Sequence, residues 1–253
     1  EEITFVGGPV LVGLLATLIS PAAPVIVAAV SVLVFASAFG LHRTASAVQP
    51  SAAHPDAVVA PRRALVTLAV LLPVAGMLLM GAFFGTTLAS LTAVMEGEDL
   101  GESTGLVYGI MGATSAVAAI TVGRLPRSFP LHLRWVIGAA AMLSAGLVLW
   151  AFPQLPVIVV VFVFVGVFVG STLVTVFTIG AESAPEGRLA TNMAMLSSAV
   201  TIGQGLTVAA VGALAEIVGA SVFVSVAAAS GVMLLVALAA SVQHKAARAR
   251  AGV

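Results

Sequence analysis

The sequence predicts an all-α integral membrane protein with eight transmembrane helices, and two observations carry this prediction. The chain of 253 residues is 60% hydrophobic and only 8% charged, whereas soluble domains carry about 25% charged residues. Its uncharged stretches are also long, and a membrane-spanning helix needs roughly 20 apolar residues. The stretches are 3–41, 64–95, 103–123, 135–181, 189–215 and 217–243. The first and fourth are about twice the required length and contain prolines, so each is predicted to form two helices.

The basic residues predict how the chain is oriented in the membrane. When eight helices are threaded across the bilayer, all ten Lys and Arg residues fall in segments on one side. The loops on the opposite side carry only acidic residues, which are Glu96, Glu98, Asp99, Glu102 and Glu216. Because cytoplasmic loops carry the excess of Lys and Arg, the basic side is predicted to be cytoplasmic, and both ends of this segment with it.

The composition excludes several classes of function. The net charge is zero, and the basic residues are scattered, so nothing favours nucleic-acid binding. The chain has no cysteine, which excludes disulfides and thiol chemistry. It has no phosphate-binding loop, zinc-ligand cluster or nucleophile–base pair, so neither an enzyme nor a cofactor nor a metal site is expected. The histidines are expected to be interfacial polar residues rather than ligands; they are His42, His54, His132 and His244.

Two helices and a linker are predicted before the main helical bundle. The helices are expected at residues 4–19 and 22–41, joined by a short turn in which Pro21 and Pro24 end one helix and start the next. Residues 42–63 contain three prolines and no hydrophobic periodicity. This segment is therefore predicted to be a flexible cytoplasmic linker and the main boundary of the chain.

Six helices are predicted after the linker, forming a bundle over residues 64–243 that is followed by a cytoplasmic tail, 244–253. They are placed at 65–93, 103–122, 135–152, 157–180, 190–214 and 220–242. Pro73 inside the first is tolerated in a membrane, where neighbouring groups can satisfy the freed carbonyl. Asp99 and Glu102 have the spacing of a capping box. Trp135 and Trp150 lie at the ends of the third helix, where interfacial aromatic residues belong.

Four short motifs occur in a fixed order along these helices. Gly8, Pro9 and Gly13 lie in the first helix, and the segments 123–127, 181–188 and 212–219 read GRLPR, AESAPEGR and GALAEIVG. With the order of two helices, a linker and six helices, they resemble helices five to twelve of the major facilitator superfamily of transporters. In that family two six-helix halves are joined by a cytoplasmic linker. The first motif resembles the fifth-helix motif of the family's exporters, with Val12 in place of one glycine, and the second resembles a cytoplasmic loop motif without its acidic residue.

The resemblance implies a function and a setting. It implies a multi-pass secondary transporter of the bacterial cell (inner) membrane that works by alternating access and leans toward export. The first four helices of the family are missing, and the chain starts at Glu1 rather than Met, so it is expected to be the C-terminal part of a longer protein. Its partners would be membrane lipid, a small-molecule substrate, protons for antiport and the missing helices of the same chain. The last six helices are expected to form two inverted three-helix repeats. The alternative is a non-transporting eight-helix scaffold or partner subunit.

Uncharged polar residues are the candidates for lining the substrate cavity. No ionisable residue lies in the middle of a predicted span, although such residues usually mark proton and ion pathways. Ser198, Thr201 and Gln204 recur every three residues and therefore share one helix face. The Gln204 amide needs a partner in the membrane, and this is either the substrate or a neighbouring helix. Weaker candidates, which can also bond their own helix, are Thr87, Tyr108 and Thr175, with Thr86, Ser90, Thr114 and Thr172 behind them.

Other residues are candidates for conformational roles. Gly8, Pro9 and Gly13 are expected to bend the first helix, because proline removes a backbone donor. Pairs of glycines four residues apart allow helices to approach closely; they are Gly81/Gly85, Gly105/Gly109 and Gly166/Gly170. In the cytoplasmic loops, the resemblance makes Glu182 an anchor for Arg124 or Arg188, and Arg127 belongs to the same loop motif as Arg124.

Overall fold

The structure is a computed structural model, and it describes residues 11–12, 15, 18–20, 22–42, 59–123, 129–218 and 222–251. These residues form α-helices and short 3-10 helices, with no strand among them. The helices are α2 (Ala23–Leu41), α3 (Leu68–Gly97), α4 (Thr104–Val122), α5 (Leu131–Ala151), α6 (Leu155–Glu182), α7 (Leu189–Val218) and α8 (Val224–Ala251), with the 3-10 helices η3 (Arg62–Val66) and η4 (Gly101–Ser103).

Seven helices of the described residues are long and apolar enough to span a membrane. The all-α membrane prediction is therefore confirmed. The expected count of eight is not tested, because the helix predicted at 4–19 falls mostly outside the described residues.

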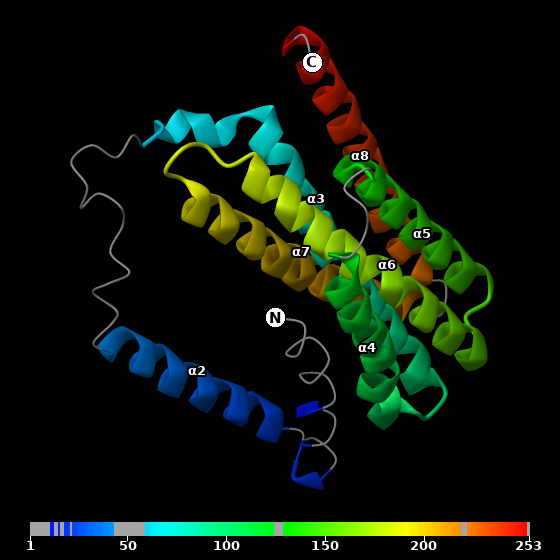
Figure 1. The fold of residues 1–253 in the computed structure, drawn as a ribbon. Helices are drawn as coiled ribbons and strands as arrows, with labels where there is room; N and C mark the ends of the chain where they lie inside the picture. Colours follow the sequence, from blue (N-terminus) through cyan, green and yellow to red (C-terminus); the bar gives the residue numbers. More distant parts are fainter. Residues whose placement is uncertain are drawn as a thin grey trace.

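The six helices α3–α8 form a bundle, and α2 lies apart from it (Figure 1). Ala23 is the one buried residue of α2. The core of the bundle is made of large apolar side chains, including Phe83, Phe84 and Phe162, which are almost completely buried. Such a core is formed between helices, while their outer faces remain apolar for contact with lipid.

The packing of the bundle has an internal symmetry. The most extensive contact is that of α3 with α7, followed by α4 with α6 and then α5 with α8. Two further contacts, α5 with α6 and α3 with α8, are almost equal in extent. Exchanging α3 with α6, α4 with α7 and α5 with α8 leaves this set of contacts unchanged. Two three-helix units of an inverted repeat would pack in this way.

Glycines bring the backbones of two helix pairs together. A Cβ atom added to Gly81 of α3 would collide with the Val200 carbonyl oxygen of α7, and one added to Gly203 of α7 would collide with the Leu78 carbonyl oxygen of α3. On α6, Gly166 and Gly170 face α4 in the same manner. The glycine pairs predicted on α3 and α6 therefore lie at close helix contacts, and the exchange of α3 with α6 relates them to each other.

Some helix ends differ from the predictions. α5 begins four residues earlier, directly after Pro130, which is its N-cap residue. A proline has no backbone N–H, so at this position no helical bond is lost. α8 continues through the basic residues of the expected tail to Ala251. The predicted capping box is wrong: no side chain caps η4 or α4, and Asp99 adopts a positive φ of 58°.

Trp135 is not an interfacial residue. It is fully buried, and its ring would collide with a Cβ atom at Gly76 of α3. Because Gly76 has no side chain, it leaves the space that the indole occupies. Trp150, at the other end of α5, is exposed, and its place at the membrane interface stays a prediction.

Candidate functional site

One face of α7 carries exposed polar side chains. Ser197, Ser198 and Thr201 are exposed, and Gln204 is half-buried. The opposite face of the same helix holds Leu196 and Ala199, which are buried in the bundle. Inside the other described helices of the bundle, exposed hydroxyl or amide side chains are isolated, namely Ser144 on α5 and Thr121 near the end of α4. The polar face of α7, defined here as Ser197, Ser198, Thr201 and Gln204, is therefore the candidate site.

The backbone of Gln204 is fixed while its side chain is left accessible. The backbone nitrogen of Gln204 lies against Gly81, 2.9 Å from where a Cβ atom of that glycine would be. Nearby, Thr207 donates hydrogen bonds to the carbonyls of Gly203 (2.7 Å) and of Ala82 on α3 (3.3 Å). Among the described residues, the Gln204 amide itself forms no hydrogen bond to a neighbouring helix. The amide is thus positioned by tight backbone packing, and it keeps its donors and acceptor for another partner.

The hydroxyls on this face differ in their bonding. Thr201 donates to the carbonyl of Ser197 at 3.2 Å within its own helix, which leaves its oxygen able to accept a further bond. The structure places Ser198 three residues earlier and also exposed. The three predicted residues of α7 are therefore brought together on one accessible face.

The other three predicted cavity residues lie inside the bundle. Thr87 and Tyr108 are buried, and their hydroxyls have no hydrogen-bond partner among the described residues. The Tyr108 ring packs edge-on against Phe162, with 6.4 Å between the ring centroids. Thr175 is buried and donates to the Ser171 carbonyl at 2.7 Å. In this conformation the structure does not bring these residues together with the polar face of α7.

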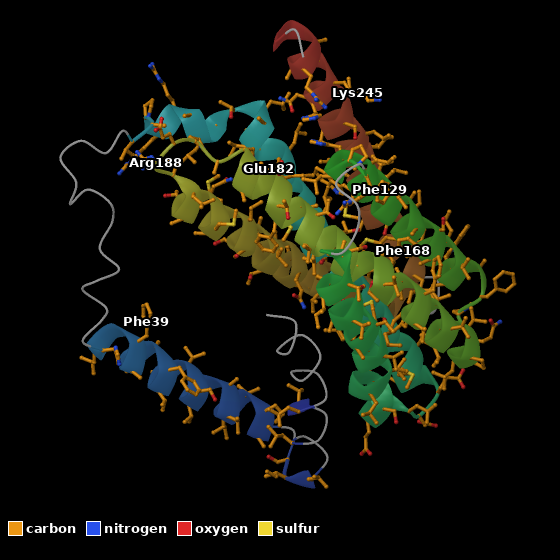
Figure 2. All side chains as sticks on the ribbon, in the orientation of Figure 1. Phe39, Phe129, Phe168, Glu182, Arg188 and Lys245 are labelled. Carbon is orange, nitrogen blue, oxygen red and sulfur yellow. The ribbon has the colours of Figure 1, made fainter. Side chains whose placement is uncertain are left out.

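The loop between α6 and α7 holds the end of the linker. The Ala60 amide donates to the Glu186 carbonyl at 2.9 Å, and the Arg188 Nε donates to the Ala60 carbonyl, also at 2.9 Å. Glu182 is exposed, and it forms no ion pair with Arg188 within the described part of the chain. Figure 2 shows Glu182 and Arg188 towards the same end of the bundle as Lys245. Arg188 thus holds a backbone segment of the linker, whereas the role of Glu182 as the anchor of this loop stays a prediction.

Several predicted residues fall outside the described part of the chain. These are Gly8, Pro9 and Gly13 of the first motif, and Arg124 and Arg127 of the loop between α4 and α5. Their roles stay predictions, as does the pairing of Glu182 with Arg124.

Two features were missed by the sequence reasoning. Asn192 of α7 is fully buried and donates through Nδ2 to the Gly180 carbonyl at the end of α6, at 2.6 Å. Arg134 directly precedes the helix predicted at 135–152, but it lies in the first turn of α5 and lines a pocket with Phe129 and Phe168. The signal for Arg134 was Pro130, which is the N-cap residue directly before the helix and cannot lie in a helix interior without loss of a bond.

Comparison with known proteins identifies the family. The family model of the Major Facilitator Superfamily matches residues 2–208. Searches of curated proteins and of solved structures each gave no match. The matched region covers well over half of the 253 residues, and it extends from the first predicted helix into α7. With its apolar helices and its bundle, the chain belongs to the Major Facilitator Superfamily, a family of membrane transporters.

Proposed function

We propose that this chain is part of a secondary transporter that works by alternating access and exports a small uncharged or amphipathic compound. The polar face of α7 carries this proposal. Three hydroxyls and one amide gather there, on an otherwise apolar surface. Hydroxyls and amides in hydrocarbon are costly unless they are hydrogen-bonded. A water-filled path with a substrate in it supplies such partners.

The chemistry of this face favours an uncharged substrate. The polar face of α7 contains no ionisable residue, and burying an unpaired charge in a membrane is costly. A substrate with hydroxyl, carbonyl or amide groups could bond to Gln204 and Thr201, while its apolar part packs against aliphatic side chains. Export is proposed from the resemblance of Gly8, Pro9 and Gly13 to the exporter motif.

Proton antiport and the bacterial cell membrane complete the proposal. No Asp, Glu or His lies in the middle of α2–α8, so the coupling acid is proposed to lie in another part of the transporter. The apolar surface of α2, exposed almost throughout, is proposed to pack against four further helices of the same chain. The close glycine contacts would keep the six-helix bundle rigid, and a rigid bundle can rock as one body during alternating access.

The Gln204→Leu variant tests the proposed site. In the full transporter, reconstituted in proteoliposomes, we expect this change to reduce transport by about five-fold while expression and folding are retained, because one uncharged hydrogen bond contributes about 1 kcal/mol. The control is Gln243→Leu, the same exchange at the end of α8 and away from the polar face. Unchanged transport by Gln204→Leu would remove this residue from the substrate path. Transport by no form of the full chain would favour the scaffold alternative.

A further inference from the structure

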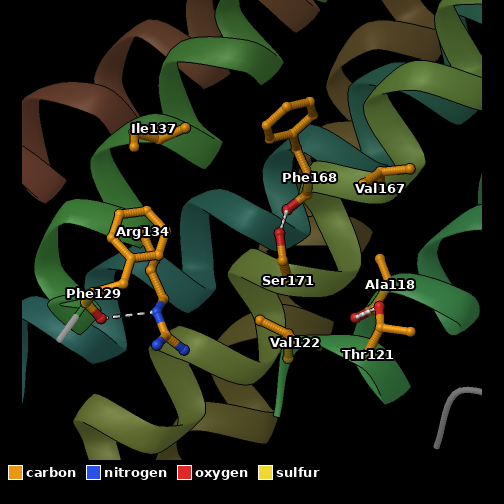
Figure 3. A pocket seen from close by; sticks show the side chains of 9 residues that line it. All are labelled: Ala118, Thr121, Val122, Phe129, Arg134, Ile137, Val167, Phe168 and Ser171. Atoms are coloured by element: carbon orange, nitrogen blue, oxygen red, sulfur yellow. Dashed lines mark hydrogen bonds between the residues drawn. The ribbon is translucent and has the colours of Figure 1, made fainter. Parts of the chain in front are cut away.

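A pocket of ≈ 320 Å³ opens between the last turns of α4, the start of α5 and the middle of α6 (Figure 3). It lies at the end of the bundle that carries the basic residues. The start of α5 is placed at that end by His132, whose ring stacks on His244 near the end of α8, with 4.2 Å between the ring centroids. The volume is at the lower end of ligand pockets, which begin at about 300 Å³.

Arg134 supplies the charge of this pocket. Among the described residues that line it, Arg134 alone is charged. Its Nε donates to the Phe129 carbonyl at 3.0 Å, and its guanidinium carbon lies 5.3 Å from the centroid of the Phe129 ring. Figure 3 shows Arg134 and Phe129 together on one side of the pocket, with Thr121 on the other. The guanidinium is therefore held at the pocket wall, and a guanidinium suits an oxyanion because it is always charged and its planar shape matches that of a phosphate.

The hydroxyls of the pocket are engaged within their own helices. Thr121 donates to the carbonyls of Val117 and Ala118, both at 3.0 Å. Ser171 donates to the Phe168 carbonyl at 3.1 Å. The anion-binding capacity of the pocket thus resides in Arg134, and the hydroxyl oxygens are left as acceptors for a donor on the ligand.

The mouth of the pocket is apolar and exposed. Ile137 is 42% exposed and Val167 is 46% exposed, and the exposed Val163 and Phe164 continue this surface along α6. A water-soluble anion would leave these side chains uncovered. A ligand that carries both an anion and long apolar chains would bind the guanidinium and cover the side chains together.

We propose that the pocket binds the headgroup of an anionic phospholipid. The phosphate accepts hydrogen bonds from the Arg134 guanidinium, and the acyl chains lie along the exposed face of α6. Basic pockets between transmembrane helices on the cytoplasmic side suit such headgroups, because that leaflet carries anionic lipid. The pocket is too small for a whole lipid, so the chains extend outside it against Val167 and Phe164.

The test is lipid binding to the full purified protein in detergent, counted by native mass spectrometry. The probes are phosphatidylglycerol and the zwitterionic phosphatidylcholine. We expect retention of phosphatidylglycerol and about ten-fold weaker binding by Arg134→Gln, which removes a hydrogen bond to a charged group. The matched control is Arg248→Gln, which removes one exposed charge from the end of α8 and should bind as the unmodified protein does.

A second pair of variants tests the contact between the acyl chains and α6 without changing the charge of Arg134. Val167→Phe fills the mouth of the pocket and should reduce binding, whereas Val160→Phe places the same ring on the same exposed face, two turns away. The proposal would be overturned if the protein bound both lipids equally, or if Arg134→Gln bound as the unmodified protein does. Equal binding by the two valine variants would overturn it as well. Displacement of the lipid by an equal concentration of inorganic phosphate would also overturn it, because it would show a site for a free anion.

Discussion

Two glycines on α7, only two residues apart, show how sharply the faces of this helix differ. A Cβ atom on Gly203 would collide with the Leu78 carbonyl of α3, whereas one on Gly205 would meet nothing within 4 Å. Gly203 is buried and Gly205 is exposed beside the polar face. The first glycine is therefore required by packing, and the second is free to change as far as the fold is concerned.

We expect Gly203→Ala to lower the free energy of unfolding by about 1–3 kcal/mol, the usual cost of overpacking a close contact. Gly205→Ala is the control, and it should leave stability unchanged or slightly raised, since alanine has the higher helix propensity. Thermal unfolding in detergent, followed by the fluorescence of Trp135 and Trp150, measures the difference. Equal melting temperatures for the two variants would contradict the close approach of α3 and α7.

At the residue scale, the sequence predicted which residues share a helix face better than it predicted what each face packs against. The spacing of Ser198, Thr201 and Gln204 was sufficient to place them together, because a helix fixes which residues share a face. The same rule says nothing about which neighbour the face meets. Tyr108 and Thr175 therefore qualified as candidates by type, and only the packing of α4 on α6 shows that they are buried.

At the scale of elements, the loop between α6 and α7 ties the linker to the bundle. Gly187 has a positive φ of 70°, a conformation that glycine adopts without strain. This turn presents the Glu186 carbonyl and the Arg188 side chain to the two backbone groups of Ala60. The start of α3 is thereby fixed beside the start of α7, next to the most extensive helix contact of the bundle.

We expect Arg188→Ala to release this end of the linker. The half-buried Arg188 contributes a charge-assisted hydrogen bond, and its loss should speed exchange of the Ala60 amide by roughly three- to ten-fold. Hydrogen exchange measured by mass spectrometry on peptides that contain residues 59–63 gives the rate. Arg248→Ala removes an arginine elsewhere and should have no effect there. If both variants exchange as the unmodified protein does, Arg188 does not hold the linker.

The helices themselves were predictable, and their ends were less so. Long apolar stretches must be helical in a membrane, since every backbone group needs an internal partner, and α2–α8 lie where this reasoning put them. At the helix ends water competes for the backbone hydrogen-bonding groups, so the local residues decide where each helix begins and ends. Pro130 started α5 early. The spacing of Asp99 and Glu102 did not produce a cap, because Glu102 lies within η4, ahead of the start of α4.

At the scale of the whole molecule, the internal symmetry could not be read from the residues. We see no convincing sequence repeat between residues 64–152 and 155–242, and the resemblance to the family alone implied the symmetry. The internal symmetry is visible instead in the contacts between helices, with glycine pairs at equivalent places on α3 and α6. Packing constrains where small residues must lie and leaves most lipid-facing positions free to vary among apolar types. Symmetry of structure therefore persists where similarity of sequence is lost.

The orientation in the membrane is the last property that the whole chain determines. These 253 residues contain no cysteine, so cysteines placed among them are read against the labelling of the unmodified full chain. Glu98 and Arg248 are both exposed. Glu98 follows the end of α3, whose 30 residues span about 45 Å at 1.5 Å each, and Arg248 lies in the last turn of α8.

In the full chain in intact cells, we expect a membrane-impermeant maleimide to label Glu98→Cys but not Arg248→Cys. Permeabilised cells should label both, which controls for accessibility. Labelling of Arg248→Cys alone in intact cells would place the basic end outside, and the excess of Lys and Arg there would then not have oriented this protein.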